Sequence, residues 1–237
     1  MSSIETRPRI DIQIDEKLLS DIPLFIAYLE IYNVNVSTSC EKQIEELSKI
    51  IEEVKSKFHD LGSLLQDRVI RAYRDFYWKI KIDPTKQRPA AEALIRRVMR
   101  HGSIPLINNV VDAGNMASLA TGIPIGLYDI DKIEGNMLLL KYSTPGDEFF
   151  PIGGKRVVLR GEPCLYDSKK ILHLYPHRDS EYTKITDMTR NVLVVSCGVP
   201  NIKYSEVLKA AELTKRYILE FAGGTTTRIV FRGSVRK

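Results

Sequence analysis

Polar residues able to hold a small substrate gather in the stretch "NNVVDAGNMASLA", near the middle of the chain. Asp112 and Asn115 stand three residues apart, a spacing that places both on one face of a helix, and Gly114 removes a side chain that would block a ligand. A carboxylate accepts hydrogen bonds or takes protons, and an amide both donates and accepts, so the two can position a water or an amino group. The alternative is structural: Asp112 caps a neighbouring loop and Asn115 satisfies buried backbone groups.

A second concentration of polar residues is "KILHLYPHRDS", in which an extended strand would place His173, Tyr175 and His177 on one face. His173 or His177 could act as a base or contact a substrate, and Arg178 and Asp179 are further candidate contacts. The alternative is that these histidines are exposed or simply hydrogen-bonded. A metal site needs a third ligand, which no nearby Cys or His supplies, so we expect no metal.

The elements that must position these residues alternate between helical and β patterns. "RIDIQID" and "DIPLFIAYLEIYNVNV" predict early strands, and residues 40 to 80 predict a helical hairpin. One further helix is predicted to have Pro89 in its first turn and Gly102 after its last turn, and another, "NNVVDAGNMASLA", to be capped by Asn108. Short apolar runs then predict strands, and residues 204 to 221 predict a last helix before a basic strand. This is an α+β or sandwich signature.

The charge distribution indicates two candidate surfaces for a polyanion. The net charge is +5, and basic residues are in excess between residues 84 and 101 and between residues 201 and 237. Helical spacing places the arginines of the first segment off its buried stripe, toward water or a phosphate backbone. The alternative is a solvated helix face and a basic tail. The candidate RNA-binding residues are Arg96, Arg97, Arg100, Lys215 and Arg216.

Cysteine usage and hydropathy favour a cytoplasmic protein. Cys40, Cys164 and Cys197 lack the paired spacing of a disulfide framework or a zinc ribbon. The first residues lack the apolar core of a signal peptide, and no apolar run approaches the roughly 20 residues of a membrane span. Four common enzyme classes lose their usual support, because no P-loop, dinucleotide fingerprint, nucleophile elbow or zinc-protease motif occurs.

Three motifs in the right order, "VVDAGN", "GIPIGLYDIDKIEG" and "RNVLVVSC", resemble the editing domain of the phenylalanyl-tRNA synthetase beta subunit, formed by paired B-three and B-four modules. The chain looks closer still to freestanding relatives of that domain, and the resemblance covers residues 83 to 198. It implies an α+β fold with a mixed β-sandwich core, flanking helices and no cofactor. Residues 83 to 200 would form this core, with 1 to 82 packed on it and 201 to 237 completing the same unit.

The resemblance also assigns residues. The helix asparagine of the editing pocket matches Asn115, and the neighbouring threonine of the synthetase is Gly114 here. Two departures matter: a synthetase histidine is replaced by Gly126, and the glutamate that recognises the tyrosine hydroxyl is replaced by Val195. In the synthetase this domain hydrolyses tyrosine wrongly attached to the phenylalanine tRNA. Because the phenol-reading carboxylate is lost, we expect a smaller or different acyl group.

The first functional hypothesis is trans-acting hydrolysis of mischarged aminoacyl-tRNA, a role in translation fidelity by a chain that is not a complete synthetase. Asn115 would position the acyl group, Asp112 the ammonium or the helix, and His173 or His177 with Arg178 the water or the terminal adenosine. The expected partner is the acceptor end of a tRNA, with no DNA or membrane partner; the acyl group and the oligomeric state stay open. The alternatives are a non-catalytic RNA-binding or partner-binding module and an enzyme acting on a small amino-acid-like molecule.

Overall fold

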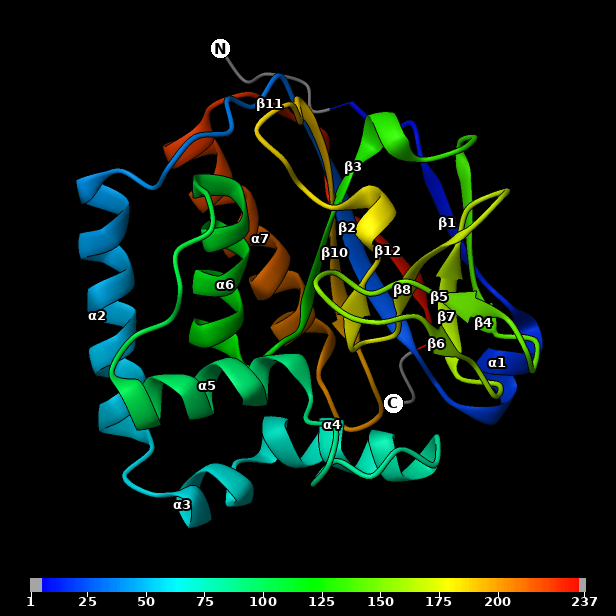
Figure 1. Ribbon diagram of the computed structural model, residues 1–237, viewed down its shortest axis with the longest axis horizontal. Coiled ribbons are helices and arrows are strands. Elements are labelled where there is room, and N and C mark those ends of the chain that lie inside the picture. The colour runs from blue at the N-terminus through cyan, green and yellow to red at the C-terminus, as the bar shows by residue number, and fades with distance from the viewer. Residues whose placement is uncertain (1–5, 235–237) are drawn as a thin grey trace.

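The computed structural model describes residues 6–234 and places a sheet of distant chain segments at its centre (Figure 1). The strand order is β11 (Thr225–Thr226), β2 (Phe25–Tyr32), β10 (Asn191–Gly198) and β3 (Ile125–Asp129), and β12 (Val230–Gly233) also pairs with β2. These pairings are antiparallel. β2 and β10 are buried almost throughout, as expected for apolar strands covered on both faces.

A second sheet packs beside the first. Its order is β1 (Asp11–Ile14), β4 (Met137–Tyr142), β7 (Pro163–Tyr166), β8 (Ile171–Leu174) and β9 (Arg178–Asp179), while β5 (Glu148–Phe149) pairs with β6 (Val157–Val158). β1 runs parallel to β4 and the other pairings are antiparallel, so the sheet is mixed. The predicted α+β fold, with a mixed β-sandwich core and flanking helices, is confirmed.

Helices cover the other face of the central sheet. α6 (Asn109–Thr121) and α7 (Tyr204–Ala222) pack against it and against each other, and α2 (Glu41–Lys57) packs outside α6 (Figure 1). The predicted hairpin over residues 40 to 80 is instead a run of helices, α2, α3 (Leu61–Gln66) and α4 (Arg68–Lys79), followed by α5 (Ala90–His101). The short helix α1 (Glu16–Asp21) was not predicted. Three-residue 3₁₀ turns occupy Ile130–Lys132 and Glu181–Thr183.

The ends of the two helices nearest the candidate site follow their sequence signals. The Asn108 side chain accepts a hydrogen bond from the Val111 N–H at 2.9 Å, capping α6. α6 ends at Gly122 and α5 at Gly102, both in the left-handed conformation that glycine adopts at little cost. The predicted cap at Asn108 and the predicted helix end at Gly102 are thus confirmed.

The edge strand β3 separates two environments, because alternate residues point to opposite faces. Ile125 and Leu127 face α6, and a Cβ atom at Gly114 would lie 2.8 Å from the Leu127 side chain. Gly126 and Tyr128 face the second sheet, where the Tyr128 ring lies 6.0 Å from the ring of His173. The edge of β3 therefore stands between the helical layer and the strands β8 and β9.

Candidate functional site

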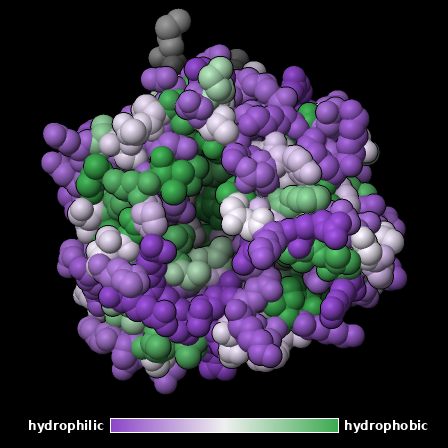
Figure 2. Space-filling view, viewed as in Figure 1, coloured by the Kyte–Doolittle hydropathy of each residue, from purple (hydrophilic) through white to green (hydrophobic). Residues whose placement is uncertain are grey.

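A cavity of about 440 Å³ opens at the edge of β3, between α5 and α6 on one side and the β8–β9 turn on the other. Figure 2 shows its mouth as a hollow near the centre of this face, with apolar residues inside and hydrophilic residues around it. Most of the lining is apolar. The polar lining residues are Arg97, Asn115, Ser118, His173, His177 and Asp179.

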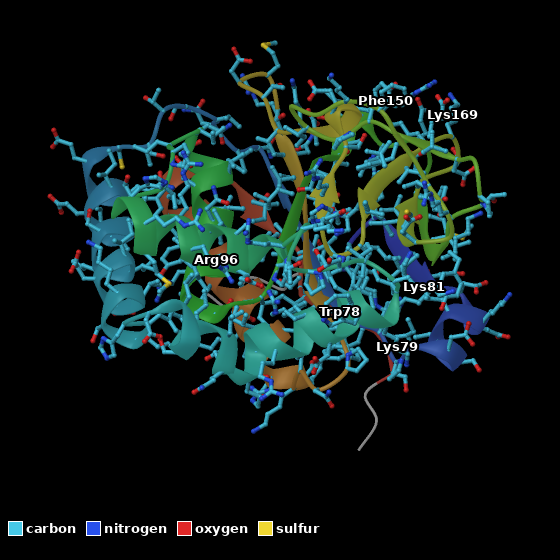
Figure 3. All side chains as sticks on the ribbon, turned by 60° about the horizontal axis from the view of Figure 1, so that its bottom comes forward. Trp78, Lys79, Lys81, Arg96, Phe150 and Lys169 are labelled. Atoms are coloured by element: carbon cyan, nitrogen blue, oxygen red, sulfur yellow. The ribbon has the colours of Figure 1, made fainter. Side chains whose placement is uncertain are left out.

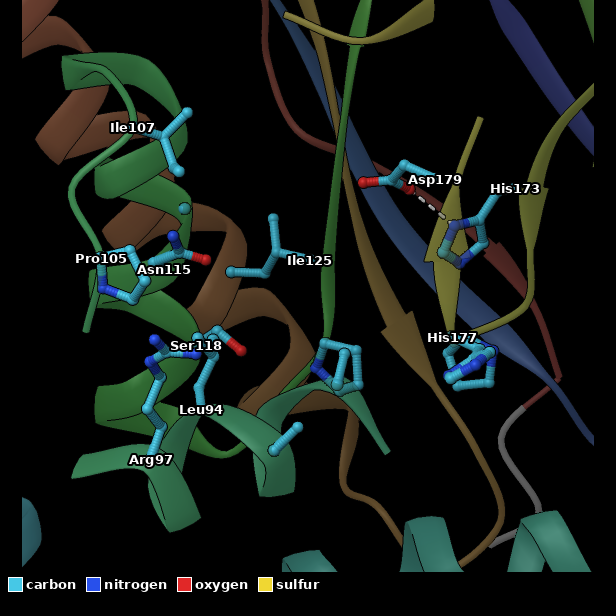
Figure 4. A pocket seen from close by; sticks show the side chains of 15 residues that line it. Leu94, Arg97, Pro105, Ile107, Asn115, Ser118, Ile125, His173, His177 and Asp179 are labelled. Atoms are coloured by element: carbon cyan, nitrogen blue, oxygen red, sulfur yellow. Dashed lines mark hydrogen bonds and ion pairs between the residues drawn. The ribbon is translucent and has the colours of Figure 1, made fainter. Parts of the chain in front are cut away.

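The helical wall of the cavity presents two polar side chains without hydrogen-bond partners among residues 6–234. Asn115 and Ser118 stand three apart on α6 and therefore share a face, and both lie on the cavity side of the helix in Figure 4. Neither side chain makes a hydrogen bond to another residue of the described chain, 6–234. An amide and a hydroxyl with unused hydrogen-bonding capacity are the groups that orient a ligand in a largely apolar cavity.

The strand wall contains a histidine whose two ring nitrogens already have neighbours. His173 Nδ1 lies 2.7 Å from Asp179 Oδ1, and its Nε2 lies 3.9 Å from the Cys197 sulfur (Figure 4 shows the first contact). A carboxylate beside one ring nitrogen fixes the proton there and holds the ring orientation. His173 is buried and is therefore a fixed part of the wall.

His177, in the turn after β8, has one unused nitrogen. Its Nδ1 lies 3.2 Å from the Tyr77 hydroxyl, whereas its buried Nε2 has no hydrogen-bond partner among the described residues. Burial, together with the charges of Arg178 and His173, lowers the pKa of His177 to about 3, so the imidazole is neutral near pH 7. A neutral ring can donate or accept through Nε2, depending on which nitrogen carries the proton.

The turn that carries His177 was predicted as a continuous strand face, and this part of the prediction was wrong. Tyr175 points into the core, where its hydroxyl lies 2.8 Å from the Gly198 carbonyl oxygen and 3.1 Å from that of Phe25. The chain turns at residues 175 to 177, so Pro176 and His177 line the cavity. Arg178 is exposed and is not among the lining residues.

Asp112 does not reach the cavity, although it is close to Asn115 in sequence. Its carboxylate accepts a hydrogen bond from the Ser39 hydroxyl at 2.6 Å and from the Ile107 N–H at 3.0 Å. Burial raises the pKa of Asp112, and these two hydrogen bonds act in the opposite direction. The contacts tie the loop before α6 to the helix and so hold Ile107 in the cavity wall, which favours the structural alternative for this residue.

Gly126 and Val195 also lie outside the cavity lining, opposite one another in the β10–β3 pairing. A Cβ atom at Gly126 would lie 2.0 Å from the Tyr128 hydroxyl, which therefore occupies the space beside this glycine. Val195 is 1% exposed in the core. A pocket walled jointly by Asn115, Gly126 and Val195 does not form, because the tyrosine side chain and the core fill that region.

The predicted basic residues of α5 are split between a buried ion pair and the surface. Arg96 was expected to face solvent, but it is 11% exposed and lies 2.7 Å from the buried Glu92, which Arg74 also contacts at 3.1 Å. This expectation was wrong, because a buried carboxylate needs paired cations. Arg97 lines the cavity, and Arg100 is exposed in the last turn of α5.

The other two predicted basic residues belong to α7. Lys215 pairs with Glu212 at 2.9 Å, and the Arg216 guanidinium lies 4.8 Å from the centre of the Tyr217 ring. Neither residue lines the cavity. Their predicted contact with RNA stays a prediction.

Sequence reasoning missed Ser118, the cavity position of Arg97 and the role of Tyr77. Ser118 carried a usable signal, because it repeats the helical spacing that joins Asp112 to Asn115. Tyr77 carried none, since its contact with His177 joins residues a hundred positions apart.

No group of three His, Cys, Asp or Glu side chains within residues 6–234 is placed to hold a metal ion. Burial raises the pKa values of the Cys164 and Cys197 thiols, so neither is an activated nucleophile.

In the part of the chain that the structure describes, no helix has the length and apolar character needed to cross a membrane.

The sequence profile of the B3/4 domain matches residues 72–228, which is more than half of the chain. The chain belongs to the B3/4 domain family. It is 28% identical over 144 residues to the phenylalanine–tRNA ligase beta subunit of Symbiobacterium thermophilum, covering 60% of this chain and 15% of the relative. It is 21% identical over 216 residues to that of Streptococcus mutans, covering 80% and 26%. The chain therefore spans only a small part of these relatives.

A solved structure supports the same fold. The N-terminal fragment of the phenylalanyl-tRNA synthetase beta subunit from Pyrococcus horikoshii superposes with a TM-score of 0.53 at 16% identity, covering 98% of this chain and 56% of the fragment. The predicted resemblance to the synthetase beta subunit is thus confirmed. The B3/4 match extends beyond the predicted residues 83 to 198 into α4 and β11.

Proposed function

We propose that this B3/4 domain protein hydrolyses, in trans, the ester bond of mischarged aminoacyl-tRNA. The observation that carries the proposal is the group of three polar side chains, Asn115, Ser118 and His177, that face a largely apolar cavity with hydrogen-bonding capacity unused by the described protein. An aminoacyl ester offers a carbonyl oxygen, a ribose hydroxyl and an ammonium group that such a site can orient.

The chemistry needs few protein groups, because the ester is already activated. The Asn115 amide can donate to the carbonyl oxygen as negative charge develops there, and this kind of stabilisation is usually the largest catalytic term. The neutral His177 can hold the attacking water through Nε2. The attacking group is water, since the two buried thiols stay protonated.

The remaining lining residues indicate how the substrate would be oriented. Arg97 is exposed and lines the cavity, where its charge suits a phosphate of the terminal nucleotide. Asp179 places a carboxylate on the opposite wall, where it suits the α-ammonium group. The largely apolar lining favours an acyl group with an uncharged side chain, and a buried Val195 offers no carboxylate to read a phenol.

The relatives supply the translation context for this proposal. The similar proteins are named as phenylalanine–tRNA ligase beta subunits, and the match lies in their B3/4 region. The chain covers a small part of each relative. We therefore propose that it recognises a tRNA acceptor end, but not that it catalyses aminoacylation.

The test is a panel of tRNAs, each charged with a correct or incorrect radiolabelled amino acid and mixed with excess protein. We expect one mischarged species to lose its label faster than the uncatalysed rate, while correctly charged species persist. Equal stability of every charged tRNA, with uncharged tRNA still bound, would support a non-catalytic RNA-binding module instead. The filled region beside Gly126 favours that alternative.

A further inference from the structure

A basic groove lies on the surface at the end of α4, outside the cavity described above. Two adjoining hollows of about 420 and 500 Å³ share Lys79 in their lining. The first also contains Lys81 and Arg160, and the second contains Lys203. We call these four cations and the surface between them the α4 groove.

The α4 groove is strongly cationic because its positive charges are not neutralised. None of its four cations has an ion-pair partner among residues 6–234, whereas many surface lysines and arginines elsewhere are paired. Its lining contains a single carboxylate, Glu162, which accepts a hydrogen bond from the Arg160 N–H at 2.6 Å. A groove of unpaired cations is an electrostatic footprint for a polyanion.

Aromatic side chains stand beside these charges. Trp78, which precedes Lys79 in sequence and lies outside the lining of the two hollows, is 54% exposed, and Tyr204 in the groove lining is 41% exposed. Figure 3 shows Trp78, Lys79 and Lys81 together at this end of the helix. Exposed aromatic rings next to cations are the combination on which unpaired bases stack while phosphates are neutralised.

The groove is connected to the cavity through the same helix. Tyr77 contacts His177 in the cavity wall, and the next two residues along α4 are Trp78 and Lys79. The chain then runs through Lys86 and Arg88, both exposed, and reaches Ala90 in the cavity lining. Cations therefore follow the chain from the groove to the cavity, where Arg97 is the last of them.

We propose that the α4 groove is the docking surface for the RNA backbone, with an unpaired base stacked on Trp78. The inference rests on the proposed function for the identity of the RNA as a tRNA, whose acceptor strand would lead from the groove into the cavity. It predicts a salt-dependent interaction, because phosphate contacts release counterions. The cations of the α4 groove, and not Arg96, would then be the main phosphate contacts, because Arg96 is buried in an ion pair.

The first test uses the intrinsic fluorescence of Trp78, which is the single tryptophan of the chain. We expect titration with unfractionated, deacylated tRNA to quench this fluorescence with the same midpoint as binding measured by anisotropy of labelled tRNA. Trp78→Ala should weaken binding about 5- to 150-fold, as alanine substitution does at base-stacking aromatics. Binding without quenching, or with unchanged affinity in Trp78→Ala, would overturn the stacking assignment.

A matched pair of charge reversals tests the phosphate contacts. Lys79→Glu and Lys169→Glu change the net charge equally, but Lys169 is 70% exposed on the distant β7–β8 turn (Figure 3). We expect Lys79→Glu to weaken tRNA binding about tenfold and flatten its salt dependence, and Lys169→Glu to change it less than about twofold. Equal losses would mean that binding follows net charge alone and would overturn the proposal.

Binding of deacylated tRNA tests this inference separately from the proposed function. Deacylated tRNA has no ester on which the cavity could act, so its binding tests the groove separately from hydrolysis. If no charged tRNA is hydrolysed but Lys79→Glu still loses binding, the docking surface stands without the activity. If deacylation occurs and Lys79→Glu binds normally, the groove assignment fails alone.

Discussion

The two faces of β3 differ in what they leave open. Toward the helices, Ile125 borders a cavity whose polar side chains face empty space. Toward the second sheet, Gly126 is covered by the fully buried Tyr128, and Val195 beside it lies in the core. Because alternate side chains of β3 point to opposite faces, this strand borders the candidate site on one face and the filled core on the other.

The difference means that Gly126 and Val195, which the resemblance suggested as substrate contacts, do not line the cavity. This chain instead fills the region around them with a phenol and aliphatic groups. Any chemistry at β3 must therefore use groups on the cavity side. Five predictions test whether β3 is open toward the helices and filled toward the second sheet.

The largest expected effect comes from adding a side chain at Gly126. Gly126→His would place a Cβ atom 2.0 Å from the Tyr128 hydroxyl, on a ring that is fully buried and has little room to move. Overpacking of this kind should cost about 3 kcal/mol or more. Thermal unfolding should show a Tm lower by roughly 6 to 12 °C.

Measuring the same substitution in a Tyr128→Ala variant tests whether the Tyr128 side chain causes the loss of stability. In Tyr128→Ala the phenol is absent, so the additional cost of Gly126→His should shrink markedly. An equal cost in both backgrounds would show that Tyr128 is not what excludes a side chain at Gly126.

On the open face, the largest effect on activity should come from Asn115→Ala. Loss of one donor to a developing oxyanion costs on the order of 10²- to 10³-fold in rate. Because Asn115 makes no hydrogen bond within the described chain, stability should change little. Single-turnover deacylation of the hydrolysed tRNA measures the effect, with the exposed Asn136→Ala as the matched amide control. An unchanged rate would remove Asn115 from the mechanism.

Only part of the cavity side of β3 could be predicted from the sequence. α6 and its cap at Asn108 were predictable, since capping and periodicity are local properties. The fold class was predictable because the motifs of the family occur in order. By contrast, Arg96 was placed in solvent, because nothing local shows that Glu92 is buried beneath it and draws in Arg74 from another helix. The turn that brings His177 to Tyr77 is likewise a long-range arrangement.

The two histidines of the strand wall should respond differently to the same substitution. His177→Gln removes an imidazole with a free Nε2 and should slow deacylation about 10²-fold. His173→Gln breaks a contact with Asp179 and should chiefly lower stability, because it disturbs a buried hydrogen-bonded pair. Rates and Tm values of both variants test this; a larger rate loss in a well-folded His173→Gln would reverse the assignment.

The pH dependence of stability should show an effect that is smaller per pH unit. The pKa of His177 is about 3 in the folded protein and 6.5 in its unperturbed state, so between these values the unfolded chain binds more protons. The contribution of His177 to the free energy of unfolding therefore rises with pH across this window and is lost as pH falls, by at most about 1.4 kcal/mol per pH unit. Urea midpoints of wild type and His177→Gln should diverge in slope there; parallel curves would show that the ring titrates normally.

The smallest effect on activity should come from Asp112, which is near Asn115 in sequence but turned away from the cavity. Asp112→Asn keeps an oxygen that can accept from the Ile107 N–H, so the loop should stay in place at a stability cost of about 1 kcal/mol. The deacylation rate should stay within about twofold of wild type, because the Asp112 side chain does not line the cavity. If Asp112→Asn slowed hydrolysis as much as Asn115→Ala at equal Tm, the carboxylate would act on the substrate, and the division between an open and a filled side of the site would have to be redrawn.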